Sequence, residues 1–326
     1  MAVYGTGVEY GAGFVYGEVF YFIDPTSGPV TGGTPVIIAG KNFLETSCDD
    51  PFDGVTINLA LWVVATNGDA SAATEGDGRL HLSAGPVAGN YARITSIDVV
   101  GDTDIEVDYF VVTPVLALPP PADVELATIM LRVDDNNYAR ISRMAGPTFG
   151  HRYEAVVVVG GVTIESASLL TSDLEGSLRI IRHDDTVYLL AGTTEVLRRT
   201  GFSMADAGSR VAVQNLTANY AVQSDFADFF VHTMVLFGTE PMLDAVVLSD
   251  DRLTGTTPPG VKVEAVDIQF ATCLEELQDF SDGFNYVDAA QFVILANMTS
   301  GQTVDVLITD DPTLRNLRGG RPGFGR

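Results

Sequence analysis

Two acidic side chains, Glu106 and Asp108, alternate with apolar residues along one short run of the chain. Residues two apart in a β-strand point to the same face, so the two carboxylates would lie side by side. A carboxylate pair on one face is the minimum that acid–base hydrolysis of a glycosidic bond requires. A simpler interpretation is a solvated strand face, since Ile105, Val107 and Tyr109 alternate with the acids and would be buried behind them.

The remaining residues that carry chemistry form no recognisable catalytic set. No Gly-x-Ser-x-Gly elbow, phosphate-binding loop or dinucleotide fingerprint is present. The histidines are scattered, and none has the spacing to a second one that a metal site would need: His81, His151, His183 and His232. The sequence therefore predicts no catalytic residues and no enzyme.

One acidic turn supplies oxygen atoms of the kind that calcium prefers. In the run Asp134-Asp135-Asn136-Asn137, the candidate ligands are Asp134, Asp135 and Asn137. The twelve-residue calcium loop pattern is absent, and most clusters of this kind are simply turns. We expect no cofactor other than a candidate structural calcium ion at this turn.

Four arginines and the single tryptophan are the candidate ligand-binding residues: Arg140, Arg143, Arg179, Arg182 and Trp62. The arginines lie on predicted neighbouring strands, where they could line one binding face. Equally, they could pair with the abundant carboxylates at the surface, where each pair contributes little. The apolar neighbours of Trp62 favour a core position over an exposed sugar-binding platform.

Composition narrows the class of protein. The 326 residues suit two or three domains, and no apolar run approaches the length of a membrane helix, so we expect a soluble protein without membrane insertion. The N-terminus lacks the features of a secretory signal. The net charge of −25 disfavours nucleic-acid binding, because an acidic surface repels phosphates. Cys48 and Cys273 could meet in space or remain free thiols.

Nearly all of the chain between its ends is predicted to be β-strand, because short β-branched and aromatic runs alternate with turn residues. Two hairpins are expected, at 128–142 and 178–190, and a long strand at 104–111. The first 20 residues interleave glycines with aromatic residues. That segment is either an extended arm that docks on a neighbour or a flexible terminus.

Two segments that lie far apart in the chain form the beginning and the end of one domain pattern. Gly32-Gly33 permits a tight turn with positive φ, and Val36 and Ile38 then point into a sandwich. The pattern begins at Phe22–Phe43 and resumes at Met234–Gly238, Thr257–Gly260 and Val266–Phe270. Together these motifs resemble an immunoglobulin-like IPT/TIG domain, split into residues 21–46 and 233–271.

The segment between the two halves, residues 47–232, resembles a concanavalin A-like jelly roll of the laminin-G-like and lectin-like kind. The resemblance rests on the order of its motifs: Asp50-Pro51-Phe52, Trp62, Gly78–Leu82, Asp104–Val111, Leu131–Ile141 and Gly176–Tyr188. Some members of that fold family are glycoside hydrolases with Glu-x-Asp-x-Glu on one strand. In this chain Phe110 stands where the second glutamate belongs, so the resemblance implies no hydrolysis.

The expected architecture is all-β: an immunoglobulin-like sandwich with an inserted concanavalin A-like jelly roll, an extended arm at 1–20, and a C-terminal accessory β region with a basic tail at 272–326. Such an architecture resembles that of tailed-bacteriophage virion proteins. It implies a non-enzymatic structural protein of the tail, fibre, neck or capsid decoration that displays a lectin-like module. The alternative is a bacterial surface adhesin or carbohydrate-binding module.

The virion interpretation carries further expectations. The partners would be other virion proteins and further copies of the same chain, with a cell-surface glycan as candidate ligand. The protein would be assembled in the host cytoplasm and then become extracellular within the virion.

Overall fold

The computed structural model shows an all-β protein, as the strand pattern predicts. The described part of the chain contains 23 strands, and within it no helix has the length and apolar character needed to cross a membrane. The expected arm, both cysteines and the basic tail lie outside it. The structure describes residues 22–40, 43, 49–112, 123–202, 205–217, 220–249, 251–271 and 278–287.

Two seven-stranded antiparallel sheets pack face to face as a jelly roll. We call the first the concave sheet. Its strands, in spatial order, are β12 (Val162–Leu170), β11 (Gly150–Val159), β10 (Asn137–Gly146), β9 (Val124–Asp134), β16 (Ala207–Asn215), β7 (Tyr91–Val100) and β4 (Trp62–Asn67). The second sheet comprises β15 (Thr194–Arg199), β14 (Thr186–Ala191), β13 (Glu175–His183), β8 (Thr103–Val111), β17 (Val222–Val231), β6 (Arg79–Ala84) and β5 (Ala72–Gly76).

Alternation of apolar and polar residues builds the core between these sheets. On β8, Ile105, Val107 and Tyr109 are fully buried and face the concave sheet across the core. The two predicted hairpins are confirmed as β9–β10 and β13–β14. Burial of one face of each sheet therefore fixes the strand register, because a shift of one residue would expose the apolar set.

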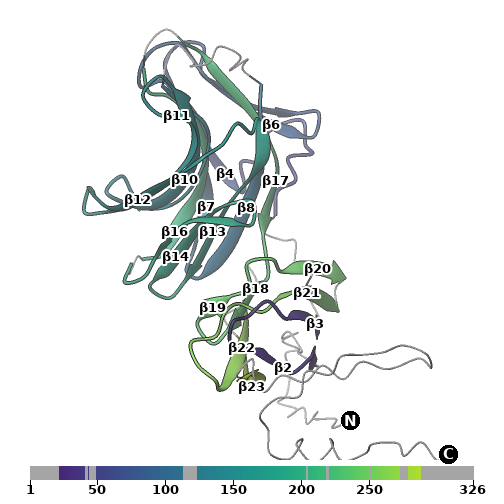
Figure 1. Cartoon of the computed structure of the whole chain (residues 1–326). Coiled ribbons are helices and arrows are strands. Elements are labelled where there is room, and N and C mark those ends of the chain that lie inside the picture. Colours follow the sequence, from purple (N-terminus) through teal and green to yellow (C-terminus); the bar gives the residue numbers. More distant parts are fainter. Residues whose placement is uncertain are drawn as a thin grey trace, which may run out of the picture.

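The concave sheet is strongly curved, and its outer face lies on the inside of the curve (Figure 1). Burial of its outward-facing side chains agrees with this shape. Thr128, Ser142 and Met144 point away from the core, yet each is at most 1% exposed. On a flat solvent-facing sheet such side chains would be open to water, so the curvature brings neighbouring side chains into contact.

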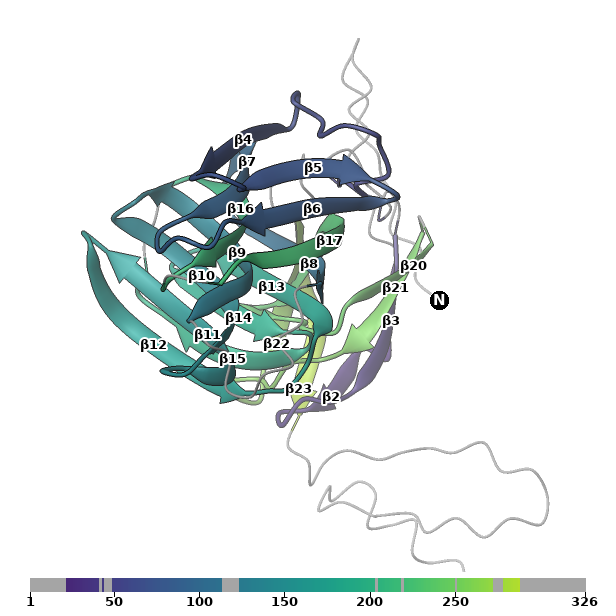
Figure 2. The same cartoon turned by 90° about the horizontal axis from the view of Figure 1, so that it is seen from above.

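A second sandwich lies at one end of the jelly roll (Figure 1), and in the view from above β3, β20 and β21 extend beyond its edge (Figure 2). One sheet has the order β1 (Phe22–Asp24), β3 (Pro35–Ala39), β21 (Arg252–Thr256) and β20 (Val246–Ser249). The other has the order β19 (Glu240–Pro241), β18 (Met234–Phe237), β22 (Ala265–Ala271), β23 (Gln278–Val287) and β2 (Ser27–Pro29). This sandwich thus combines strands that precede the jelly roll with strands that follow it.

The opening motif has the local geometry that its residues predict. Gly32 and Gly33 have φ of +72° and +78°, a region that favours glycine. A Cβ on Gly32 would lie 2.6 Å from the backbone of Pro258, so the closing loop packs directly on this turn. Val36 and Ile38 are buried in the core of the second sandwich. The two halves of the motif, over 200 residues apart, therefore meet in space.

The chain enters and leaves the jelly roll at adjacent positions. Asp50 and Phe229 form an isolated antiparallel bridge in which each backbone N–H donates to the other's carbonyl at 2.9 Å. The backbone N–H of Val231 also donates to Asp49 at 2.8 Å. Close termini allow one domain to be inserted into another without disrupting it. In addition, β23 pairs with β22, so this part of the expected C-terminal region belongs to the second sandwich.

A small apolar cluster joins the two sandwiches. Ile181, Tyr188 and Leu190 on the outer face of the second sheet pack against Met234 and Leu236 of β18. All five side chains are at most 2% exposed. The second sandwich therefore covers part of the second sheet, while the concave sheet faces away from it (Figure 1).

Candidate functional site

Only one of the four candidate arginines lies on the concave face. Arg140 on β10 forms ion pairs with Glu125 on β9 and Glu154 on β11, the latter at 3.5 Å. The charge of Glu125 raises the pKa of the Arg140 guanidinium despite its burial. The arginine is thus a bridge between two carboxylates of the adjacent strands.

The other three arginines lie elsewhere, and the structure does not bring the four together on one face. Arg143 is fully buried and donates to the backbone carbonyl of Asp173 at 2.8 Å, and burial lowers its pKa. Arg182 is buried and donates to the carbonyl of Ala205. Arg179 lies on the second sheet. The sequence left two roles open for these arginines, ligand binding and pairing with carboxylates. Arg140 and Arg179 pair with carboxylates, the latter with Asp104.

Trp62 lies in the jelly-roll core, the role that its sequence neighbours favour. Its side chain is 2% exposed, and its ring packs edge-on against Phe229 with centroids 4.9 Å apart. The indole Nε1–H donates to the carboxylate of Asp50 at 2.6 Å. The ring is therefore inaccessible to a ligand and fastens the point where the chain enters the jelly roll.

In the acidic turn between β9 and β10, the carboxylate oxygens bind neighbouring groups of the protein. The Asp134 carboxylate accepts hydrogen bonds from the backbone of Asn136 at 2.7 Å and from the Asn137 side chain at 2.9 Å. Asp135 pairs with Arg132 at 2.6 Å, and this contact lowers the pKa of the carboxyl. These contacts account for the residues as a turn, and the calcium site stays a prediction.

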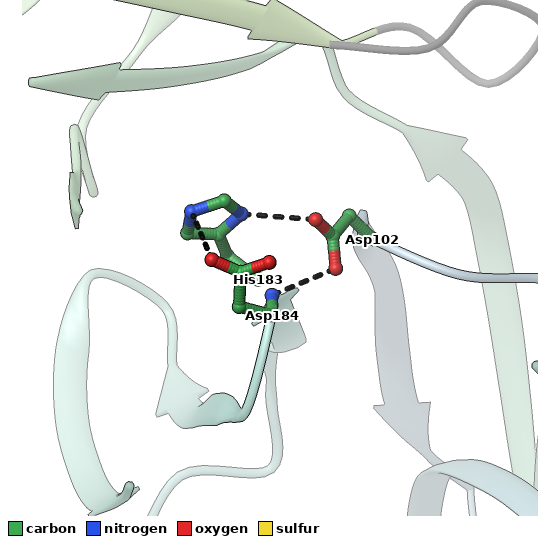
Figure 3. A group of neighbouring side chains, drawn as sticks. All are labelled: Asp102, His183 and Asp184. Atoms are coloured by element: carbon green, nitrogen blue, oxygen red, sulfur yellow. Dashed lines mark hydrogen bonds and ion pairs between the residues drawn. The ribbon is translucent and has the colours of Figure 1, made fainter. Parts of the chain in front are cut away.

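A different acidic group combines a histidine with two aspartates (Figure 3). His183 at the end of β13 lies 3.0 Å from Asp102 and 3.4 Å from Asp184 through its two ring nitrogens. Burial lowers the pKa of His183, but the hydrogen bond and charge of Asp102 outweigh it and raise the pKa overall. Because Asp102 also accepts the backbone N–H of Asp184, the group holds the β7–β8 turn, which joins the two sheets, against the β13–β14 turn.

The concave face carries an ordered network of polar side chains. Glu154 accepts from Arg152 at 2.5 Å as well as from Arg140, so the two arginines hold this carboxylate from both sides. Beside them, the Thr128 hydroxyl donates to Ser142 at 2.8 Å. These contacts fix the side chains in place before any ligand arrives, which lowers the entropic cost of binding.

Aromatic and amide side chains lie beside this network. Tyr138 is the cross-strand neighbour of Arg132, and Tyr91 is that of Gln214, all on the outward face of the concave sheet. The guanidinium of Arg93 lies 4.3 Å from the ring centroid of Tyr91. All of these side chains are partly exposed. The face therefore offers aromatic surfaces with hydrogen-bonding groups around them.

A cavity of about 490 Å³ lies where the second sheet meets the second sandwich. Glu106, Ser177 and Phe230 line it from the jelly roll, His232 lines it from the connection, and Asp244–Val247 line it from the second sandwich. Ligand sites occur preferentially at such domain junctions.

The alternating carboxylates of β8, of which Glu106 lines this cavity, have divergent environments. Burial opposes ionisation of Glu106, but hydrogen bonds from His232, at 2.8 Å, and from Ser177 hold its pKa below the usual value. Burial, together with the charges of Glu106 and Asp228, raises the pKa of Asp108 to about 6. Two neighbouring carboxyl groups with pKa values pushed apart are the arrangement that acid–base catalysis uses.

No protein-family model matches the chain, and no curated protein matches it. Solved structures with a similar fold include a β-glucanase from Bacillus licheniformis, 11% identical over 56% of this chain and 96% of its own, with a TM-score of 0.44. The catalytic domain of an endo-1,3-β-glucanase from Thermotoga petrophila is 14% identical over 56% and 95%, with a TM-score of 0.42. The Crh5 transglycosylase is 13% identical over 68% and 95%, with a TM-score of 0.44.

These comparisons correct the functional expectations. The prediction of a non-enzymatic virion protein is wrong against this finding, because the similar folds belong to carbohydrate-active enzymes. That prediction used analogy of architecture, and one fold hosts many functions. The two packed seven-stranded sheets confirm the jelly roll. The structures named above support neither the IPT/TIG resemblance nor a phage origin.

Proposed function

We propose that the protein is a carbohydrate-active protein whose concave face binds a glycan chain. The observation that carries the proposal is the preorganised polar and aromatic surface of the concave sheet. Sugars present hydroxyl groups around weakly polar ring faces, so they need hydrogen-bonding groups beside an aromatic surface. Tyr91 and Tyr138 supply the rings, and the network around Arg140 supplies donors and acceptors.

Binding to immobilised neutral and acidic polysaccharides tests this proposal. We expect Tyr138→Ala and Tyr91→Ala each to weaken binding of the recognised glycan about tenfold, because each removes an aromatic contact surface. The matched control is Phe22→Ala, since Phe22 is an exposed aromatic residue on the second sandwich. The proposal fails if no polysaccharide binds, or if the three variants bind alike.

Hydrolysis of a glycosidic bond is the second candidate function, and the divergent pKa values of Glu106 and Asp108 favour it. Asp108 would donate its proton to the oxygen of the leaving sugar. Glu106 would take a proton from a water molecule, whose oxygen attacks the anomeric carbon. The Cα atoms of alternate residues on a strand lie about 6.7 Å apart. Carboxyl groups at a similar separation leave room for that water.

The pH dependence of turnover tests this second candidate. Asp108 must be protonated, so activity should fall as the pH rises above about 6. Glu106 must be ionised, so activity should also fall below its lowered pKa. Release of reducing ends from polysaccharides measures both limits. Asp108→Asn should abolish the release, and unchanged release in that variant would exclude the pair as the catalytic centre.

A further inference from the structure

Three arginines from three adjacent strands form a diagonal row on the concave face, with Arg210 in the middle. Arg210 on β16 lies between Thr95 on β7 and Met130 on β9. Arg93 lies two residues from Thr95 toward one end of the sheet, and Arg132 lies two residues from Met130 toward the other end, both on the same outward face as Arg210. Diagonal neighbours in a sheet are within reach of long side chains. We call Arg93, Arg132 and Arg210 the arginine triad.

Arg210 occupies the centre of the triad with few partners. The residue is only 7% exposed, and its one hydrogen bond to a described residue runs from Nε to the Thr95 hydroxyl at 3.1 Å. Burial, and then the charges of Arg93 and Arg132, lower its pKa to about 10. Its two terminal amino groups can therefore donate hydrogen bonds to a ligand. The positive charge at this position is poorly compensated.

Two other arginines on the outward face of the concave sheet, Arg140 and Arg152, have a structural role, because carboxylates of the same sheet neutralise them. Arg140 and Arg152 both contact the carboxylate of Glu154, and Arg140 also contacts Glu125. Within the described residues, the triad has only one ion pair, between Arg132 and Asp135, whose side chain is 82% exposed. The Asp135 carboxylate also acts on Arg93 and Arg210 through its charge, so one acidic group faces three arginines, although the whole chain carries a net charge of −25.

We propose that the arginine triad binds an oxyanion substituent, a carboxylate or a sulfate, carried by the sugar units of an acidic glycan. The inference rests on the proposed glycan-binding role of the concave face and adds the class of ligand. Guanidinium groups match the geometry of such oxyanions and bind them with paired, charge-assisted hydrogen bonds. A bound anion would also relieve the mutual repulsion of the three arginines. Tyr91, against Arg93, would lie next to the sugar ring that carries the anion.

Paired polysaccharides that differ only in charge test the inference on the full chain. The carboxylate pair is polygalacturonate and its methyl ester, and the sulfate pair is dextran sulfate and dextran. Calorimetry or affinity electrophoresis should show one anionic polymer bound at least about tenfold more tightly than its neutral counterpart. Such a preference would come from the arginine triad and not from the overall charge, because the acidic protein as a whole repels polyanions.

Single substitutions locate the anion preference. Arg93→Gln and Arg132→Gln should each reduce affinity for the preferred anionic polymer about tenfold. Both should melt at a temperature close to that of the parent protein, because each removes like-charge repulsion and Arg132→Gln loses only the exposed pair with Asp135. The matched control, Arg252→Gln, removes an exposed arginine from the second sandwich and should leave the affinity within about twofold.

Each outcome decides between the two proposals. If neutral and anionic polymers bind equally and the triad variants bind as the parent does, the anion inference is overturned while glycan binding stands. If anionic polymers are preferred but Arg93→Gln and Arg132→Gln bind like Arg252→Gln, the anion site lies elsewhere and the inference is again overturned. If no polysaccharide binds at all, the proposed function and the inference fall together.

Discussion

Replacing Asp104 with alanine should lower the free energy of unfolding by about 3–5 kcal/mol, the cost of breaking a buried ion pair from one side. The Asp104 carboxylate binds the Arg179 guanidinium through two hydrogen bonds, one of them 2.7 Å long. Both side chains are at most 5% exposed. The substitution would leave Arg179 as an unpaired buried charge beside the carbonyl of Leu243, which it also contacts. Urea unfolding followed by fluorescence measures the loss.

A surface pair supplies the control for that measurement. Arg198 and Glu240 also link the jelly roll to the second sandwich, at 2.7 Å, but Arg198 is 40% exposed. Glu240→Ala should therefore cost less than about 1 kcal/mol. Equal losses in Asp104→Ala and Glu240→Ala would contradict the view that the buried pair stabilises the domain junction.

Replacing Trp62 with alanine should cost about 3–5 kcal/mol, because it opens a cavity in the jelly-roll core. The change also removes the hydrogen bond to Asp50. Trp62→Phe keeps most of the ring and should cost about 1–3 kcal/mol, chiefly through the unsatisfied carboxylate. Thermal unfolding of both variants measures the difference.

Glycan binding separates the core role of Trp62 from a role as a sugar-binding platform. Below their melting temperatures, both variants should bind the recognised glycan as the parent does, since the ring is 2% exposed. Loss of affinity in a folded Trp62→Phe variant would contradict the core assignment.

The alternation of apolar and polar residues predicted the strands, because a strand that buries one face needs an apolar residue at every second position. On β8 the fully buried residues are the alternating apolar ones, and the β9–β10 and β13–β14 hairpins form at their predicted turns. The glycines of the opening motif adopt positive φ, as the turn requires, and the closing loop packs against Gly32. These features depend on local chemistry, which one sequence contains.

The four candidate arginines do not lie on one face, and strand parity explains why. Arg140 and Arg143 are three residues apart, so they point to opposite faces of β10, and the same holds for Arg179 and Arg182 on β13. Moreover, β10 and β13 belong to different sheets. Parity is visible in the sequence, whereas the assignment of strands to sheets is not.

The arginine triad and the environment of the β8 carboxylates could not be predicted from the sequence. The triad comes from strands far apart in the chain, and its contacts depend on the cross-strand register of β7, β9 and β16. The sequence did identify Glu106 and Asp108 as a pair, but the absence of a further acid at Phe110 argued against chemistry. Burial beside His232 and Asp228, which separates their pKa values, arises only in the folded protein.

A crystal structure of the protein with its recognised glycan tests the central claim most directly. We expect sugar rings against Tyr91 and Tyr138 on the concave face, with an acidic substituent within hydrogen-bonding distance of Arg210. A glycan bound in the cavity between the sandwiches, or on the second sandwich, with the concave face empty, would contradict it.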